Sequence, residues 1–164
     1  MKPETSAAQA LGHIDPTTRA LVPPIHSSTT FERDADGSYP AGFGYTRADN
    51  PGYDLPEQLL AKLEAGSSAM LFASGMAAAT SVFCALVPGD HVVAPKVMYW
   101  ALRKWIGEFA MTWGIEVSFV DTSKPDEVSA AIRPGDTRIV WIETPANPNW
   151  QITDIRDMAD IAHA

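Results

Sequence analysis

The sequence has little cysteine, few basic residues and no long apolar run, and each shortage excludes a class of protein. One cysteine, Cys84, excludes an internal disulfide and any zinc site built from several cysteines. Twelve Lys and Arg against twenty Asp and Glu give a net charge of −8, and because the basic residues are scattered, we expect no nucleic-acid surface. No stretch reaches the roughly 18 apolar residues that cross a bilayer, and the N-terminal residues lack a secretory signal. These shortages predict an acidic, soluble cytoplasmic protein without membrane or nucleic-acid partners.

The histidines lack partners at ligand spacing, so no metal site is expected.

The chain is expected to have two parts, with a boundary between residues 55 and 56. Residues 1–55 hold six of the thirteen prolines and show neither a helical nor a strand period. Their aromatic residues are unusual for a solvated linker, and so long a structureless run is uncommon inside a compact domain. We interpret this part as an arm that becomes ordered on another surface, with disorder as the alternative.

From residue 56 onward, strands and helices alternate. Short apolar runs predict buried strands over 69–73, 91–94, 115–120 and 138–143. Helical periods predict helices that begin at Pro56, Met76, Tyr99 and Pro125, and a last one capped by Asp154 that runs to Ala164. This alternation is typical of a mostly parallel α/β sheet with flanking helices, and it breaks off as if the segment were part of a longer design. Cys84 falls within an apolar helix and is interpreted as a core residue, not a nucleophile.

Ligands of open parallel sheets bind at the carboxyl ends of the strands, and three of these ends carry chemically useful residues. After the run 69–73, Ser74-Gly75-Met76 offers free N–H groups to a phosphate, although an ordinary turn capped by Ser74 has the same residues. After 91–94, Lys96 could form a Schiff base or bind phosphate, or simply be a surface residue. Tyr99 could be a stacking platform or an acid–base group, or a core aromatic.

The third strand end is followed by Glu143-Thr144-Pro145-Ala146-Asn147-Pro148. A carboxylate at the end of an apolar strand is costly to bury without a partner, and the two prolines would aim Asn147. A rigid structural turn is the alternative for this motif. In the arm, Arg47 offers a planar fork suited to phosphate, beside the hydroxyl donor Tyr45. A surface arginine next to a packed tyrosine is the alternative for that pair.

In this order and spacing, the motifs resemble those of the pyridoxal-phosphate (PLP) enzymes of cysteine and methionine metabolism, from about residue 20 to the end. This trans-sulfuration family includes cystathionine γ-synthase, cystathionine γ- and β-lyases, methionine γ-lyase and the homoserine-ester sulfhydrylases. The resemblance is carried by Val22-Pro23-Pro24-Ile25, Tyr45-Thr46-Arg47 with Asn50-Pro51, Leu63-Glu64, Ser74-Gly75-Met76-Ala77-Ala78, Gly89-Asp90-His91, Tyr99 and the motif at 143–148.

The resemblance implies that residues 56–164 are the first part of the large PLP domain of the type I aminotransferase-like fold. It implies a homotetramer, a dimer of dimers, in which the arm 1–55 docks on a neighbouring subunit. The cofactor is pyridoxal 5'-phosphate, and the substrate is a small amino acid. The cofactor-binding residues would be Ser74, Gly75 and Met76 at the phosphate, Tyr45 and Arg47 reaching it from the neighbouring subunit, Tyr99 stacked on the ring, and Asn147 at the ring oxygen or the substrate carboxylate. Tyr99 would also be catalytic, through proton transfer.

The implied reaction is elimination or replacement at Cγ, or at Cβ, of a sulfur-containing or homoserine-derived amino acid, with the cofactor as electron sink. A cystathionine β-lyase, an inactive fragment acting as an assembly module, and an unrelated α/β phosphate-binding domain are the alternatives. The sequence departs from the family at Trp100-Ala101-Leu102, where many members have Gly-Gly-Thr or Gly-Cys-Thr after the tyrosine. The family's Schiff-base lysine, and the aspartate that pairs with the pyridine nitrogen, are expected beyond Ala164.

Overall fold

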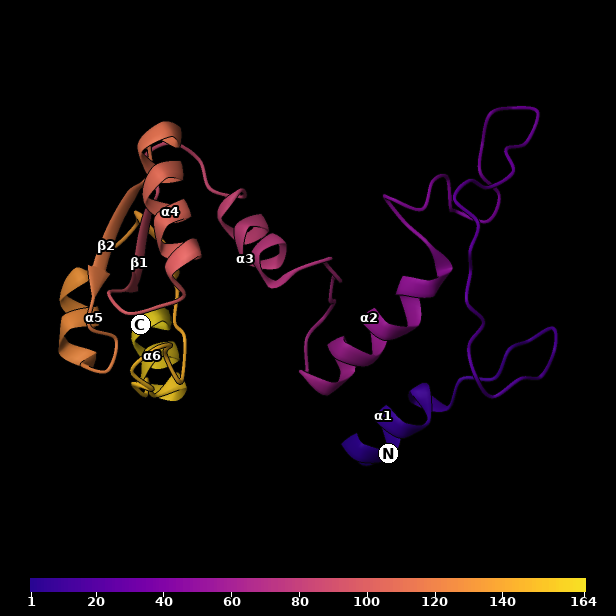
Figure 1. The fold of residues 1–164 in the computed structure, drawn as a ribbon, viewed down its shortest axis with the longest axis horizontal. Helices are drawn as coiled ribbons and strands as arrows, with labels where there is room; N and C mark the ends of the chain where they lie inside the picture. The colour runs from indigo at the N-terminus through magenta and orange to yellow at the C-terminus, as the bar shows by residue number, and fades with distance from the viewer. The chain divides into compact units, whose positions relative to one another are not determined.

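A computed structural model describes residues 1–164 and divides them into two compact units, Met1–Phe72 and Ala73–Ala164 (Figure 1). No helix in either unit is both long and apolar enough to cross a membrane. Nor does any group of three or more His, Cys, Asp or Glu side chains come together in a way that could hold a metal ion.

The first unit consists of short helices joined by long irregular stretches. Its elements are the helices α1 (Pro3–Ala8) and α2 (Pro51–Leu63) and the 3-10 helix η1 (Ala10–Gly12). Between η1 and α2 the chain forms turns and one isolated antiparallel bridge, between Thr30 and Tyr45. The expectation that residues 1–55 hold no helix is therefore wrong at both ends of that range, where α1 lies and where α2 begins.

Helix α2 begins at Pro51, and the predicted start at Pro56 is wrong. Asn50 is extended and caps the helix, because its Oδ1 accepts a hydrogen bond from the Gly52 N–H at 2.8 Å. The Asn50 amide in turn donates to Thr46 Oγ1 at 2.9 Å, which ties the capping residue to the turn that precedes it. A capping asparagine followed by proline at the first helical position is the stronger start signal, and Pro56 is tolerated inside the helix at the expense of one backbone hydrogen bond.

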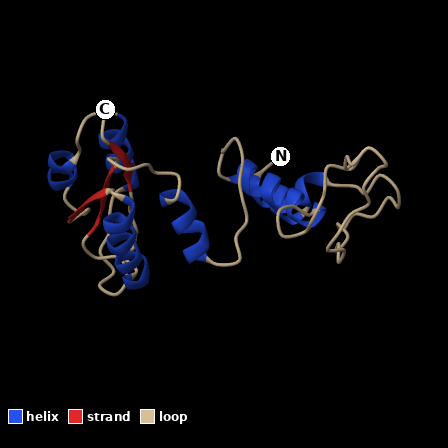
Figure 2. Cartoon of the chain, turned by 90° about the horizontal axis from the view of Figure 1, so that it is seen from above, coloured by secondary structure: helices blue, strands red, loops and turns tan.

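The second unit is a parallel α/β sheet, as the alternation predicted. Its strands are β1 (His91–Pro95), β2 (Glu116–Val120) and β3 (Thr137–Val140), arranged in the order β2-β1-β3 with both pairs parallel. Its helices are α3 (Gly75–Phe83), α4 (Trp100–Trp113), α5 (Pro125–Ala131) and α6 (Ile155–His163). Figure 2 shows the strands with these helices around them. All five residues of β1 are buried, because it is the central strand.

Two cores cover the two faces of the sheet, and alternate residues of β1 contribute to each of them. On one face, Val92 and Ala94 pack with side chains of α3 and α4, among them Phe83 and Ile106. On the other face, Val93 packs with Val128 of α5 and Met158 of α6. The sheet is thus sandwiched between helices, and the carboxyl ends of its strands are left available at one edge.

Two predicted helix boundaries, the end of α4 and the start of α6, are confirmed by the backbone. Gly114 ends α4 in the left-handed conformation, at φ 74°, which costs glycine little. Asp154 caps α6 by accepting hydrogen bonds from the N–H groups of Arg156 and Asp157. These ends depend on local chemistry, which the sequence displays directly.

Two predictions for the region around α3 are wrong. The apolar run 69–73 forms no strand, and Met70 within it is 75% exposed. A strand needs a hydrogen-bonding neighbour, and the sheet of the second unit consists of β1, β2 and β3. Cys84 is exposed, not a core residue, because α3 ends at Phe83 and the ring of Phe83 takes the core position.

His91, at the start of β1, joins all three strands through its side chain. Its Nδ1 lies 2.8 Å from Thr137 Oγ1 of β3 and its Nε2 lies 2.9 Å from Ser118 Oγ of β2. The ring is fully buried. Burial, and secondarily the positive charge of Arg133, lower the pKa of His91 below its usual value.

We expect His91 to make the protein less stable in mild acid. The unfolded chain takes up the proton near the ordinary histidine pKa of about 6.5, whereas the folded chain resists it. Above that pH, His91 therefore causes no loss in the free energy of unfolding. As the pH drops towards the folded-state pKa, the free energy of unfolding falls by at most about 1.4 kcal/mol per pH unit. Urea unfolding at about pH 7.5 and about pH 5.5 measures this loss.

The matched variants are His91→Gln, which cannot titrate, and His163→Gln, which removes an exposed histidine in the last turn of α6. His91→Gln should flatten the pH dependence, and His163→Gln should leave it as in the parent. An unchanged pH dependence in His91→Gln would contradict the assignment to this ring.

Candidate active site

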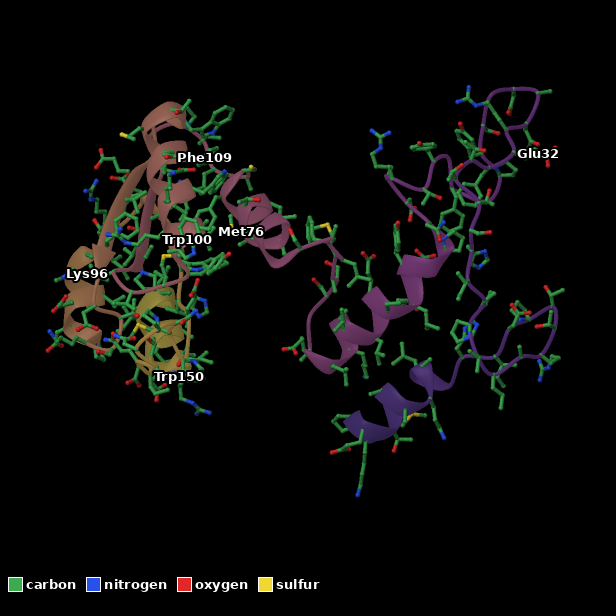
Figure 3. The ribbon with its side chains drawn as sticks, in the orientation of Figure 1. Glu32, Met76, Lys96, Trp100, Phe109 and Trp150 are labelled. Atoms are coloured by element: carbon green, nitrogen blue, oxygen red, sulfur yellow. The ribbon has the colours of Figure 1, made fainter.

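Three segments meet at an open cavity of about 440 Å³ within the second unit. The start of α3 contributes Ser74, Gly75 and Met76; the start of α4 contributes Tyr99 and Leu102; and the segment after β3 contributes Trp141 and Glu143. Two of these segments follow the carboxyl ends of β1 and β3, which is where ligands of parallel sheets bind. Figure 3 labels Met76 at the start of α3 and Trp100 at the start of α4.

The start of α3 is arranged as an anion-binding helix terminus. Ser74 is extended, and its Oγ accepts a hydrogen bond from the Ala77 N–H at 3.1 Å. The N–H groups of Gly75 and Met76 are left without a partner in the chain. A Cβ atom built on Gly75 would meet nothing within 4 Å, so the space beside these N–H groups is open. The helix dipole and the free N–H groups together favour a phosphate here.

Tyr99 is the capping residue of α4 and is not part of the core. Its side chain is 43% exposed and makes no capping hydrogen bond. Its own N–H donates to Glu143 Oε2 at 2.8 Å. The carboxylate after the apolar strand therefore has the partner that its position requires. The ring of Trp100, which is 71% exposed, lies next to that of Tyr99 with the centroids 6.3 Å apart.

Other sequence-predicted residues lie outside this cavity. Lys96 pairs with Glu127 at 3.4 Å and lines a separate hollow of about 150 Å³. Asn147 is exposed and is not among the residues that line the cavity. Tyr45 and Arg47 belong to the first unit, where the Arg47 guanidinium lies 5.3 Å from the centre of the Tyr45 ring.

Sequence reasoning missed Trp141 as a lining residue. Its indole Nε1 is buried without a hydrogen-bond partner, and its ring packs against Phe83 with the centroids 5.2 Å apart. A usable signal was present, because residues two apart in an extended segment point to the same side, so Trp141 shares a side with Glu143.

A parallel α/β sheet that presents a free helix N-terminus and an aromatic ring at one edge belongs to a class of proteins suited to a phosphorylated, flat cofactor. The comparisons with known proteins agree with this class. A family model described as Cys/Met metabolism PLP-dependent enzyme matches residues 4–164, and the chain belongs to this family. The resemblance inferred from the motifs is thereby confirmed.

The relatives include enzymes of two reaction types. Human cystathionine gamma-lyase is 40% identical over 147 residues, which are 90% of this chain and 36% of that protein. Cystathionine gamma-synthase of Mycobacterium tuberculosis is 39% identical over 160 residues, which are 97% of this chain and 41% of that protein. The crystal structure of metB from Corynebacterium glutamicum superposes with a TM-score of 0.86 at 37% identity, over 99% of this chain and 44% of that one.

The chain thus spans less than half the length of each of these relatives. The match to metB confirms the expected fold class. The parallel sheet and its helices superpose on that structure, and the sequence identity is well above the chance level.

The enzymes of this family depend on pyridoxal 5'-phosphate, and the residues at the cavity fit that group. The free N–H groups at Gly75 and Met76 match its phosphate, and the open space at Gly75 allows a close approach. The half-exposed ring of Tyr99 offers a flat surface for its pyridine ring.

Proposed function

We propose that the whole protein is a PLP-dependent enzyme that eliminates or replaces the substituent at Cγ, or at Cβ, of a sulfur-containing or homoserine-derived amino acid. The observation that supports this most strongly is one cavity lined by a phosphate-type helix terminus, an aromatic ring and the segment after β3. When bound, the cofactor supplies an electron sink for carbanion chemistry. The named relatives, a gamma-lyase and a gamma-synthase, favour Cγ.

In this proposal, each segment of the cavity has a separate task. The N–H groups of Gly75 and Met76 bind the phosphate, and Ser74 holds the turn that presents them. The ring of Tyr99 covers one face of the cofactor, and its hydroxyl moves a proton at the substrate. Asn147 does not line the cavity itself, but it lies on the loop that follows Glu143, and in this proposal it contacts the cofactor's ring oxygen or the substrate carboxylate.

We further propose that residues 1–55 form an arm that docks on a neighbouring subunit of a homotetramer, a dimer of dimers. The arm would carry Tyr45 and Arg47 to the phosphate of that subunit, and residues 56–164 would begin the PLP domain. Apolar side chains of the arm support this, because Val22 is 78% and Ile25 is 96% exposed within this chain. Apolar residues so exposed and only three positions apart favour a protein surface as their partner. A cytoplasmic location fits a chain with one cysteine.

Assays of the whole protein with PLP test the reaction. With cystathionine as substrate, elimination at Cγ releases 2-oxobutanoate and elimination at Cβ releases pyruvate, while replacement on a homoserine ester with cysteine forms cystathionine. We expect a visible cofactor band and reaction at Cγ. Pyruvate as the main product would favour the β-lyase, and a colourless protein without turnover would favour an assembly module.

A charge variant tests the phosphate site in the same assays. Gly75→Asp places a carboxylate at the N-terminus of α3. The helix dipole stabilises a negative charge there, so the fold should survive, but the carboxylate repels a bound phosphate, so PLP affinity should fall at least about tenfold. Gly107→Asp is the matched control, because a Cβ at Gly107 in α4 also meets nothing within 4 Å but Gly107 does not line the cavity. Equal PLP affinity in the two variants would contradict the site.

A further inference from the structure

The start of α4 is stabilised by a side chain from a distant part of the sequence. The first turn of α4 contains no acidic residue, and Tyr99, its capping residue, provides no side-chain acceptor. Glu143 supplies both missing elements, because its carboxylate accepts the Tyr99 N–H at 2.8 Å. A carboxylate at a helix N-terminus satisfies a free N–H group and complements the helix dipole.

The segment that carries Glu143 is anchored on both sides of the carboxylate. Before it, Trp141 packs against Phe83, whose side chain is fully buried. After it, Thr144 Oγ1 accepts the Thr153 N–H at 3.1 Å, and Ala146 is buried. Because its backbone is held at both ends, Glu143 can place its partner more accurately than a side chain on a free loop could.

We propose that Glu143 is a positioning residue that acts through Tyr99. By holding the Tyr99 N–H, the carboxylate sets where α4 begins and thus the direction in which the Tyr99 ring enters the cavity that both residues line. This inference rests on the proposed function of Tyr99. An anchored support of this kind matters because small displacements of a catalytic group lower turnover sharply.

Two substitutions at Glu143 separate the hydrogen-bond acceptor from the negative charge. Glu143→Gln keeps an oxygen that can accept the Tyr99 N–H, and Glu143→Ala removes it. In the whole protein with PLP, we expect Glu143→Ala to lower kcat about tenfold with a smaller change in KM, and Glu143→Gln to retain most of the activity. Without PLP, hydrogen exchange of the Tyr99 N–H should be faster in Glu143→Ala than in Glu143→Gln.

A double-mutant cycle with Tyr99→Phe shows whether Glu143 acts through Tyr99. Once the hydroxyl is absent, Glu143→Ala should lower kcat by much less than it does in the parent. Equal losses in the two backgrounds would overturn the proposal. If Tyr99→Phe itself leaves kcat unchanged, the proposed function of Tyr99 fails, whereas the exchange experiment still decides whether Glu143 holds the Tyr99 N–H.

Asp154→Ala is the matched control for loss of a helix cap. Asp154 is also a carboxylate that caps a helix, since it accepts the Arg156 N–H at 2.8 Å and the Asp157 N–H at 3.1 Å, but it does not line the cavity. We expect Asp154→Ala to lower the thermal midpoint and to leave kcat at the parent value. A kcat loss as large as that of Glu143→Ala would mean that the Glu143 effect reports stability alone, and would overturn the positioning role.

Discussion

Tyr99→Phe is expected to lower the turnover of the whole protein about 10²- to 10⁴-fold while PLP remains bound. Stacking requires only the ring, which phenylalanine keeps, whereas proton transfer requires the hydroxyl, which it lacks. Tyr99 lines the cavity beside the free N–H groups of α3, and its partial exposure leaves the ring accessible to a ligand. Steady-state kinetics give the turnover, and the visible spectrum with a PLP titration shows whether the cofactor site is intact.

Two neighbouring variants make the result specific. Tyr99→Ala removes the ring as well, so it should also weaken PLP binding. Trp100→Phe changes an exposed ring beside Tyr99 that does not line the cavity, and it should keep turnover near the parent value. If Tyr99→Phe turned over normally while Tyr99→Ala unfolded, Tyr99 would be a structural aromatic.

Arg47→Ala is expected to weaken PLP binding about ten- to a hundredfold, because one charge-assisted contact to a phosphate contributes roughly 1.5–3 kcal/mol. Arg47 forms no ion pair within the chain, and its guanidinium lies over the Tyr45 ring. Its hydrogen-bonding groups are therefore available to an anion. Arg33→Ala is the matched control, since Arg33 lies 4.8 Å from the ring centre of Tyr39 in the same part of the chain. It should leave PLP affinity unchanged.

Mixed subunits show whether Arg47 serves the neighbouring site. In a dimer of one Arg47→Ala subunit and one Tyr99→Phe subunit, exchange of the arms leaves one site with both changes and the other with neither. Activity should then return to about half of the parent value. If Arg47 acts within its own subunit, both sites carry one change, and no activity returns at a PLP concentration that fills parent sites but leaves Arg47→Ala sites empty. Purified heterodimers with differently tagged subunits make this comparison.

The sequence by itself determined the features that depend on residues close together in the chain and on the periodicity of apolar residues. Gly114 and Asp154 mark helix ends because a left-handed glycine and a capping carboxylate work within one turn. The alternation of apolar runs with helical periods determined the parallel sheet, since strands buried on both faces must be apolar throughout. The order of the motifs determined the family, which the comparisons confirmed.

Only the tertiary structure decided the features that depend on distant partners. The run 69–73 is as apolar as a strand but forms none, because an apolar run becomes a strand only where a neighbouring strand completes its hydrogen bonds. Cys84 lies in an apolar stretch, but its exposure followed from where α3 ends. Glu143 and Tyr99 are 44 residues apart, and no local pattern links a carboxylate after one strand to the helix after another. Their contact exists because β1 and β3 are neighbours in the sheet, so their carboxyl ends bring the two residues together.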